Sequence, residues 1–204
     1  QWRTLTESQP LDFMDRVLLP QYVKITRLLA NSVLGARPLD LVPTMNATTG
    51  LNAVLASMQR HKLLSNVLYV DIGYGANKVM ADYYTSQGAL GGEGSVTTVP
   101  ILGDAPEYNS SSNDDDPNRL SNYIVDQVKR AIERAGQRSF SLAIFDHVTS
   151  NTAVKLPVSA LTELCHSNGI PVLIDGAHSV GQVSDFHLGS PTEALAYDVQ
   201  QDNT

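Results

Sequence analysis

Apolar residues recur along the chain with two spacings, one typical of amphipathic helices and one of short buried strands. In residues 47–60, for example, Leu51, Val54, Leu55 and Met58 follow the i, i+3, i+4, i+7 spacing that places side chains on one helix face. Short apolar runs bounded by polar residues and glycines predict strands. The predicted helices span residues 47–60, 75–87, 118–135 and 157–168, and the predicted strands span residues 66–71, 95–101, 140–145 and 170–174.

Strands and helices alternate from residue 66 onward. This order predicts an α/β fold with a mostly parallel sheet and helices on both faces. The acidic, polar stretch 103–117 is predicted to be a surface loop. In sheets of this kind, ligands bind at the carboxyl ends of the strands, so the residues that follow each strand are where a site is expected.

The N-terminal part of the chain has a different organisation. Residues 11–34 carry apolar positions at helical spacing and predict a helix that is broken or kinked at Pro20. Residues 35–45 contain a glycine and two prolines and predict a loop. We therefore predict an N-terminal helical segment with a linker over residues 1–45, followed by a second domain over residues 46–204.

Composition and charge exclude several classes of protein. Of 204 residues 42% are hydrophobic, so the chain can form a globular core, and 14 Lys and Arg against 21 Asp and Glu give a net charge of −7. This sign argues against nucleic acid as a partner, and no apolar run is long enough to predict a membrane span. A single cysteine, Cys165, excludes an intrachain disulfide and is predicted to be a buried apolar residue. With no secretory signal pattern, the chain is predicted to be cytoplasmic.

Polar residues follow three of the four predicted strands. Tyr74 follows the first strand, Asp146 and His147 follow the third, and Asp175 and His178 follow the fourth. Such residues next to glycine-containing turns predict a binding site. The alternatives stay open: the two aspartates can cap turns, the histidines can be buried without a chemical role, and Tyr74 can belong to the core.

A metal-assisted hydrolase is a further alternative. Asp146, His147, Asp175 and His178 are residue types that suit a hard or borderline metal ion, but no spacing among them selects one. We therefore predict no metal site. A serine hydrolase is also disfavoured, because the chain has no G-x-S-x-G motif.

Four motifs together resemble one enzyme family: NATTGLNAVL at 46–55, YGA at 74–76, FDHVTSNTAVKLPV at 145–158 and GIPVLIDGAHSVG at 169–181. The combination is similar to the class V aminotransferase family of pyridoxal-phosphate enzymes. Within it, the chain looks most like the isopenicillin-N-epimerase-like branch, which includes cysteine desulfhydrases and sulfoxide lyases. The resemblance covers about residues 40–190 and implies part of the large domain of the type I pyridoxal-phosphate fold, with pyridoxal 5'-phosphate as cofactor.

The resemblance also implies roles for individual residues. Asp175 would partner the pyridine nitrogen and His178 the phenolic oxygen, and these two are the implied catalytic residues. Tyr74 would stack on the cofactor ring. The remaining cofactor-binding residues would be Ala47, Thr48 and Thr49 at the phosphate, and Thr149 and Ser150 near the phenolic oxygen. The physical chemistry agrees, because helix N-termini favour phosphate and a carboxylate keeps a pyridine nitrogen protonated.

The implied reaction is a lyase, epimerase or aminotransferase reaction on an amino acid, with sulfur-containing amino acids among the candidates, in a homodimer of the full-length protein. The family's aldimine lysine lies in an Asn-x-His-Lys stretch downstream of DGAH, whereas this chain ends in AYDVQQDNT, and Lys155 does not match that position. We therefore expect an N-terminal portion that is inactive alone. The alternative is a non-catalytic module that binds the cofactor or dimerises.

Overall fold

The computed structural model describes residues 2–87, 94–102, 118–136 and 139–184. The chain divides into two compact units, one formed by residues 1–44 with 183–204 and the other by residues 45–182. The predicted loop 103–117 and the last residues, 185–204, lie outside the described residues. The domain boundary drawn from the sequence at residue 46 stays a prediction.

The first unit is helical over most of residues 2–34. Its helical backbone begins at Trp2 rather than at residue 11, and it continues through Pro20 instead of breaking there. Pro20 is the second residue of α3 and closely follows the π-helical segment η1, so the change of helix type lies next to the residue that has no backbone N–H. The elements are α1 (Trp2–Ser8), α2 (Pro10–Phe13), η1 (Met14–Leu18), α3 (Leu19–Leu29) and η2 (Ala30–Leu34). Gly35, with φ of 58°, ends the helical backbone.

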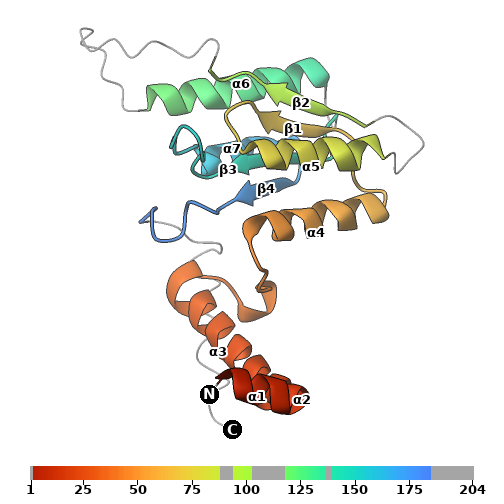
Figure 1. The fold of residues 1–204 in the computed structure, drawn as a ribbon. Coiled ribbons are helices and arrows are strands. Elements are labelled where there is room, and N and C mark those ends of the chain that lie inside the picture. Colours follow the sequence, from red (N-terminus) through yellow and green to blue (C-terminus); the bar gives the residue numbers. More distant parts are fainter. Residues whose placement is uncertain (1, 88–93, 103–117, 137–138, 185–204) are drawn as a thin grey trace. The chain divides into compact units, whose positions relative to one another are not determined.

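The second unit is built on a four-stranded parallel sheet (Figure 1). The strand order is β2-β1-β3-β4, so the chain first moves outward from β1 to β2 and then returns to the other side of β1. The reversal lies between β1 and β3. The predicted α/β fold with a parallel sheet is confirmed, and the strands are β1 (Val67–Val70), β2 (Val96–Val99), β3 (Leu142–Asp146) and β4 (Val172–Asp175).

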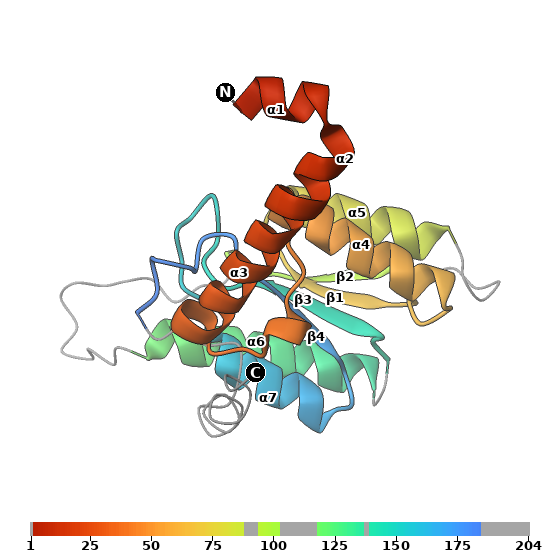
Figure 2. The ribbon, with the colours of Figure 1, turned by 90° about the horizontal axis from the view of Figure 1, so that it is seen from below.

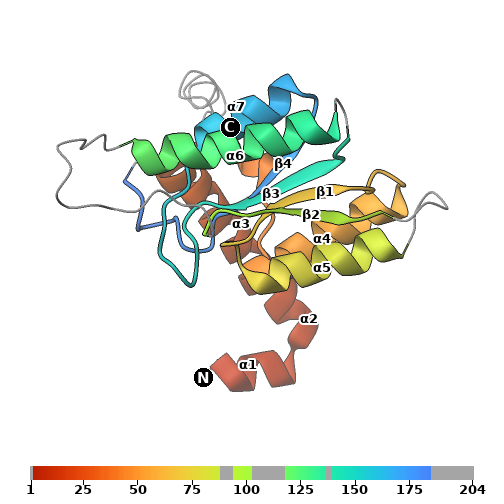
Figure 3. The same ribbon diagram turned by 90° about the horizontal axis from the view of Figure 1, so that it is seen from above.

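Helices cover both faces of the sheet, as Figures 2 and 3 show: α4 and α5 lie on one face, and α6 and α7 lie on the other. Alternate strand residues supply the two cores, because neighbouring side chains point to opposite faces. Leu68 and Val70 of β1 belong to the core with α6 and α7, whereas Val67 and Tyr69 belong to the core with α4 and α5. The helices are α4 (Ala47–Arg60), α5 (Gly75–Ser86), α6 (Arg119–Ala135) and α7 (Val158–Ser167).

Two expectations about single features can be compared with this arrangement. Cys165 is buried among the apolar side chains of α6 and α7, as its spacing along the predicted helix indicated. Within the part of the chain that the structure describes, no helix has the length and hydropathy to cross a bilayer.

The packing of α4 predicts a large difference between two neighbouring positions. Leu55 is 0% exposed, whereas Val54 on the same helix is 42% exposed. Leu55→Ala should lower the free energy of unfolding by about 2–5 kcal/mol, because it leaves a cavity between α4 and the sheet. Val54→Ala is the matched control and should change it by less than about 1 kcal/mol. Equal losses in urea denaturation would contradict this assignment of the core.

Candidate functional site

One cavity of about 290 Å³ lies in the second unit, where the carboxyl ends of the strands meet the N-terminal turn of α4. It lies beside the reversal of strand order between β1 and β3, the usual position of a ligand site in open α/β sheets. Its lining residues are Asn46, Ala47, Thr48, Tyr74, Asp146, Val148, Ser150, Asp175, Ala177 and His178.

The α4 end of the cavity favours an anion. Asn46 caps the helix, since its Oδ1 accepts the Thr49 amide at 2.8 Å and the Thr49 hydroxyl at 3.0 Å. The amides of Ala47 and Thr48 stand in the first turn, where an amide has no acceptor within its helix. No acidic residue lies in this turn, so the positive end of the helix dipole is not neutralised locally.

Tyr74 borders the cavity and is held through its backbone. Its side chain is 41% exposed, but its N–H donates to Asp146 Oδ2 at 2.9 Å and its carbonyl accepts the Tyr69 hydroxyl at 2.7 Å. Burial, followed by the charges of Asp146 and Asp175, raises the pKa of Tyr69 and keeps its hydroxyl a donor. Two buried groups therefore fix the peptide units on either side of Tyr74.

Two carboxyl groups stand side by side at the strand ends, because Asp146 of β3 pairs in register with Asp175 of β4. Asp146 is 3% exposed, and burial, then the nearby Asp175 charge, raises its pKa to about 6. Asp175 is half-buried and keeps both oxygens hydrogen bonded: Oδ2 accepts Asn77 Nδ2 at 2.7 Å, and Oδ1 accepts the Ala177 amide at 3.0 Å.

The structure separates the other expected site residues into two groups. His178 and Ser150 are exposed and line the cavity. Thr149 is buried and does not line it, since its hydroxyl bonds Thr152 and the Val154 backbone and shapes the loop after β3. Thr49 likewise does not line the cavity, because both its amide and its hydroxyl serve the helix cap.

His147 and Lys155 lie away from the cavity. His147 is buried, and burial, followed by the Lys155 charge, lowers its pKa. Of these two neighbours, Asp146 lines the cavity and His147 does not. Lys155 is exposed, and its backbone bridges Val148. No lysine is among the described residues that line the cavity.

Three residues that support the site were not predicted from the sequence. Tyr69 falls inside an apolar strand pattern, and Asn77 falls in the first turn of α5, where asparagine is ordinary. Gly73 lies against the Tyr69 ring, since a Cβ on Gly73 would lie 2.6 Å from Tyr69 Cζ. The short interval between Tyr69 and Asn77 was the available hint, because all three residues flank the Tyr74 turn.

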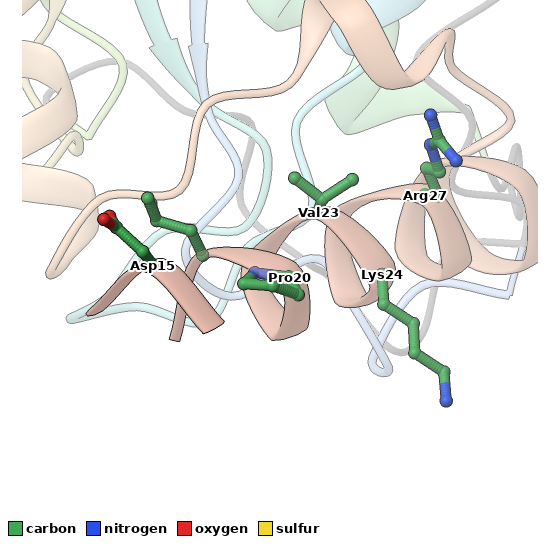
Figure 4. Close-up of a pocket in the computed structure, with 6 residues that line it drawn as sticks. Asp15, Pro20, Val23, Lys24 and Arg27 are labelled. Atoms are coloured by element: carbon green, nitrogen blue, oxygen red, sulfur yellow. The ribbon is translucent and has the colours of Figure 1, made fainter. Parts of the chain in front are cut away.

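Other places in the described chain lack comparable chemistry. Within the described ranges, no group of three or more His, Cys, Asp or Glu residues could hold a metal ion. The metal-assisted hydrolase therefore gains no support. A second hollow lies along the first unit, with lining side chains that all come from η1 and α3, so it is helix surface rather than a convergence of elements (Figure 4).

No protein-family model matches the chain, but individual proteins of similar sequence were found. A rice protein (Oryza sativa subsp. japonica) named as a candidate L-cysteine desulfhydrase is 28% identical over 192 residues, 90% of this chain and 36% of its own length. An isopenicillin N epimerase of Amycolatopsis lactamdurans is 28% identical over 180 residues, 88% of this chain and 40% of its own. The chain thus spans about two fifths or less of the length of these relatives.

A solved structure of the cystine C-S lyase C-DES matches with a TM-score of 0.62 and 17% identity, over 89% of this chain and 43% of that chain. The cysteine desulfurase CsdA from Escherichia coli matches with a TM-score of 0.59 and 18% identity, over 90% of this chain and 40% of that chain. At such identities the likeness shows a shared fold.

The contact between Gly73 and Tyr69 yields a prediction with a built-in control. Gly73→Ala should lower the free energy of unfolding by about 1–3 kcal/mol, because its Cβ would push the Tyr69 ring away from Tyr74. A Cβ on Gly75, two residues away, would meet nothing within 4 Å. Gly75→Ala should therefore leave stability unchanged or raise it by up to about 1 kcal/mol. Equal effects in urea denaturation would refute the close approach.

The raised pKa of Asp146 predicts how stability changes with pH. Between its ordinary value of 3.8 and about 6, Asp146 is neutral when folded and ionised when unfolded. The unfolded state then binds fewer protons, so the stability that Asp146 contributes is lost as pH rises through this window. Asp146→Asn should gain stability relative to wild type across it and then level off above it. A difference that stays constant from pH 3.5 to about 7 in denaturation experiments would contradict the buried state of Asp146.

Proposed function

Because the chain has the parallel α/β fold of type I pyridoxal-phosphate enzymes and is related to their class V aminotransferase-like family, we propose that its cavity binds pyridoxal 5'-phosphate. The observation that carries the proposal is the polarity of the cavity. Its lining includes the N-terminus of a helix, the Asp175 carboxylate and the aromatic residue Tyr74. Such a lining suits a flat ring with a cationic nitrogen and an anionic tail.

The phosphate would bind at the first turn of α4. The Ala47 and Thr48 amides and the Thr48 hydroxyl are the donors that line the cavity there, and the helix dipole favours a dianion. Thr49 would contribute through the Asn46 cap, because its own polar groups bond Asn46. The role of Thr49 is thus proposed to be support of the turn.

The ring would lie against Tyr74 with its nitrogen at Asp175. When bound, the protonated ring would withdraw electrons from the substrate α-carbon. Asp175 would hold the proton on the ring nitrogen, since a carboxylate raises the pKa of a neighbouring cationic acid. Asn77 and the Ala177 amide fix both oxygens of Asp175, so its orientation is set before any ligand arrives.

His178 and Ser150 would serve the phenolic oxygen of the ring. Both are exposed side chains with hydrogen-bond donors on the cavity wall, whereas Thr149 would shape the loop that carries Ser150. His178 also lies close enough to Asp146 for its charge to lower the pKa of that carboxyl. The charge of His178 therefore influences the ionisation of Asp146 on the same cavity wall.

The substrate is proposed to be an amino acid, with sulfur-containing amino acids favoured. The names of the relatives refer to cysteine, cystine and isopenicillin N. Cysteine is an amino acid, and the other two compounds are built from amino acids. Lyase, epimerase and aminotransferase reactions all remain within the proposal, because one cofactor supports each of them. Homodimerisation of the full-length protein stays a prediction from the resemblance.

Binding of pyridoxamine 5'-phosphate tests the proposal directly, because this amine form cannot form a Schiff base with surface lysines. The wild-type chain should bind it, and Asp175→Asn should bind about 10–100-fold more weakly, since a charged hydrogen bond is lost. Asp71→Asn is the matched control: Asp71 follows β1, accepts the Ile101 amide at 2.8 Å and does not line the cavity. Ligand fluorescence supplies the measurement, and no binding by the wild-type chain would refute the proposal.

A further inference from the structure

Asp146 is the most deeply buried charged group that lines the cavity, and the proposed function assigns it no role. It stands at the end of β3, next to Asp175 of β4. Only one of its oxygens has a hydrogen-bond partner, since Oδ2 accepts the Tyr74 amide while Oδ1 is buried and unpaired. A buried oxygen without a hydrogen-bond partner costs free energy, so the neighbours of this carboxyl group need to be considered as the reason for it.

The first neighbour is the backbone of Tyr74. The Asp146 carboxylate binds the Tyr74 N–H across the reversal of strand order, and the Tyr69 hydroxyl binds the Tyr74 carbonyl from below. Gly73 permits this arrangement, because any side chain there would collide with the Tyr69 ring. The peptide on each side of Tyr74 is held by a buried group, so the position of its ring depends on Asp146.

The second neighbour is Asn77, which connects the two carboxyl groups. Asn77 is 1% exposed, its Nδ2 donates to Asp175 Oδ2 at 2.7 Å, and its side chain also stabilises the ionised form of Asp146. One amide therefore faces two adjacent acids. A change of charge on Asp146 alters the field at Asp175 through this contact and through their direct repulsion.

The charged and titratable groups around Asp146 come from three directions. Asp175 faces it from β4 and disfavours its ionisation, His178 faces it from the turn after β4 and favours it, and the Tyr69 hydroxyl faces it from β1. Burial, the largest cause, and the Asp175 charge raise the pKa of Asp146 to about 6, which is close enough to neutrality for a nearby cation to change its protonation. A protonated ring nitrogen at Asp175 is such a cation.

We propose that Asp146 is a positioning residue for the cofactor ring: it holds the backbone of Tyr74, and its negative charge, acting beside Asp175 and Asn77, strengthens the binding of a protonated pyridine. This inference rests on the proposed function, because it concerns the same cavity and the same ligand. The inference assigns a role to a second acid besides Asp175. This second acid, Asp146, lies on the neighbouring strand and is shielded from solvent.

The pH dependence of ligand binding separates this electrostatic role from a structural one. The dissociation constant of pyridoxamine 5'-phosphate is measured from pH 5 to about 8 for wild type and Asp146→Asn, which keeps an oxygen to accept the Tyr74 amide. If the bound cation lowers the pKa of Asp146 by about one unit, the variant binds about tenfold more weakly above pH 6. The ratio of the two constants then falls toward one as pH drops below about 6, where wild-type Asp146 is neutral.

Two controls accompany this comparison. Inorganic phosphate, which needs only the α4 end of the cavity, should bind wild type and Asp146→Asn equally. Asp71→Asn should bind pyridoxamine 5'-phosphate as wild type does at every pH, because Asp71 lies outside the cavity lining.

A ratio that is constant with pH would overturn the inference, since a purely structural loss has no reason to follow the ionisation of Asp146. That result, with tight binding by wild type, leaves the proposed function intact. Absence of binding by wild type would instead refute the proposed function, and the inference with it.

A second measurement keeps the inference testable even if Asp146→Asn does not fold. The ¹³Cγ resonance of Asp146 in the wild-type 204-residue chain should titrate with a midpoint near 6 and move to lower pH when pyridoxamine 5'-phosphate is added. A midpoint that is unchanged by the bound ligand would show that Asp146 does not sense the ring, and would overturn the inference.

Discussion

The hydrogen bond between the Tyr74 amide and the Asp146 carboxylate joins the two strands between which the sheet order reverses. A chain that leaves β1 in one direction and returns as β3 on the other side opens a gap above the strand ends, and this bond spans it. The buried Tyr69 hydroxyl donates a hydrogen bond to the Tyr74 carbonyl, and the absence of a side chain on Gly73 leaves space for the Tyr69 ring. The peptide units on both sides of Tyr74 are thereby hydrogen bonded to buried side chains.

The chemistry of the cavity follows from how the core positions the two opposite kinds of charge. Leu51 and Leu55 pack α4 onto the face of the sheet that also buries Tyr69, which brings the N-terminal amides of α4 to the same cavity as the strand ends. The strand ends carry Asp146 and Asp175 in register. A positive helix terminus and a pair of acids therefore share one small volume, which suits the proposed ligand with its anionic phosphate and cationic ring nitrogen.

Much of this architecture could be predicted from the sequence because it rests on repeating patterns. The helical spacing of Leu51, Val54 and Leu55 and the apolar runs of the strands led to the observed elements within a few residues, and their alternation led to the parallel sheet. The break that Pro20 suggested does not occur, because the backbone stays helical there, with a change from π-helix to α-helix beside it.

Single side chains were harder to interpret. Threonines next to a cavity look alike in sequence whether they line it or bond groups nearby in the chain. The Thr49 hydroxyl donates to the Asn46 side chain, and the Thr149 hydroxyl accepts the Val154 amide. Asn77 was missed because its role arises from a contact with Asp175, 98 residues away, and Tyr69 was missed because an apolar strand pattern does not show that its hydroxyl bonds the Tyr74 carbonyl. Only the folded chain brings these groups together.

The most direct test of the account is a crystal structure of the chain with pyridoxamine 5'-phosphate. The account predicts the phosphate at the amides of Ala47 and Thr48, the ring against Tyr74 and the pyridine nitrogen within hydrogen-bond distance of Asp175. A ligand bound elsewhere, or one in this cavity with its phosphate at the strand ends, would contradict it.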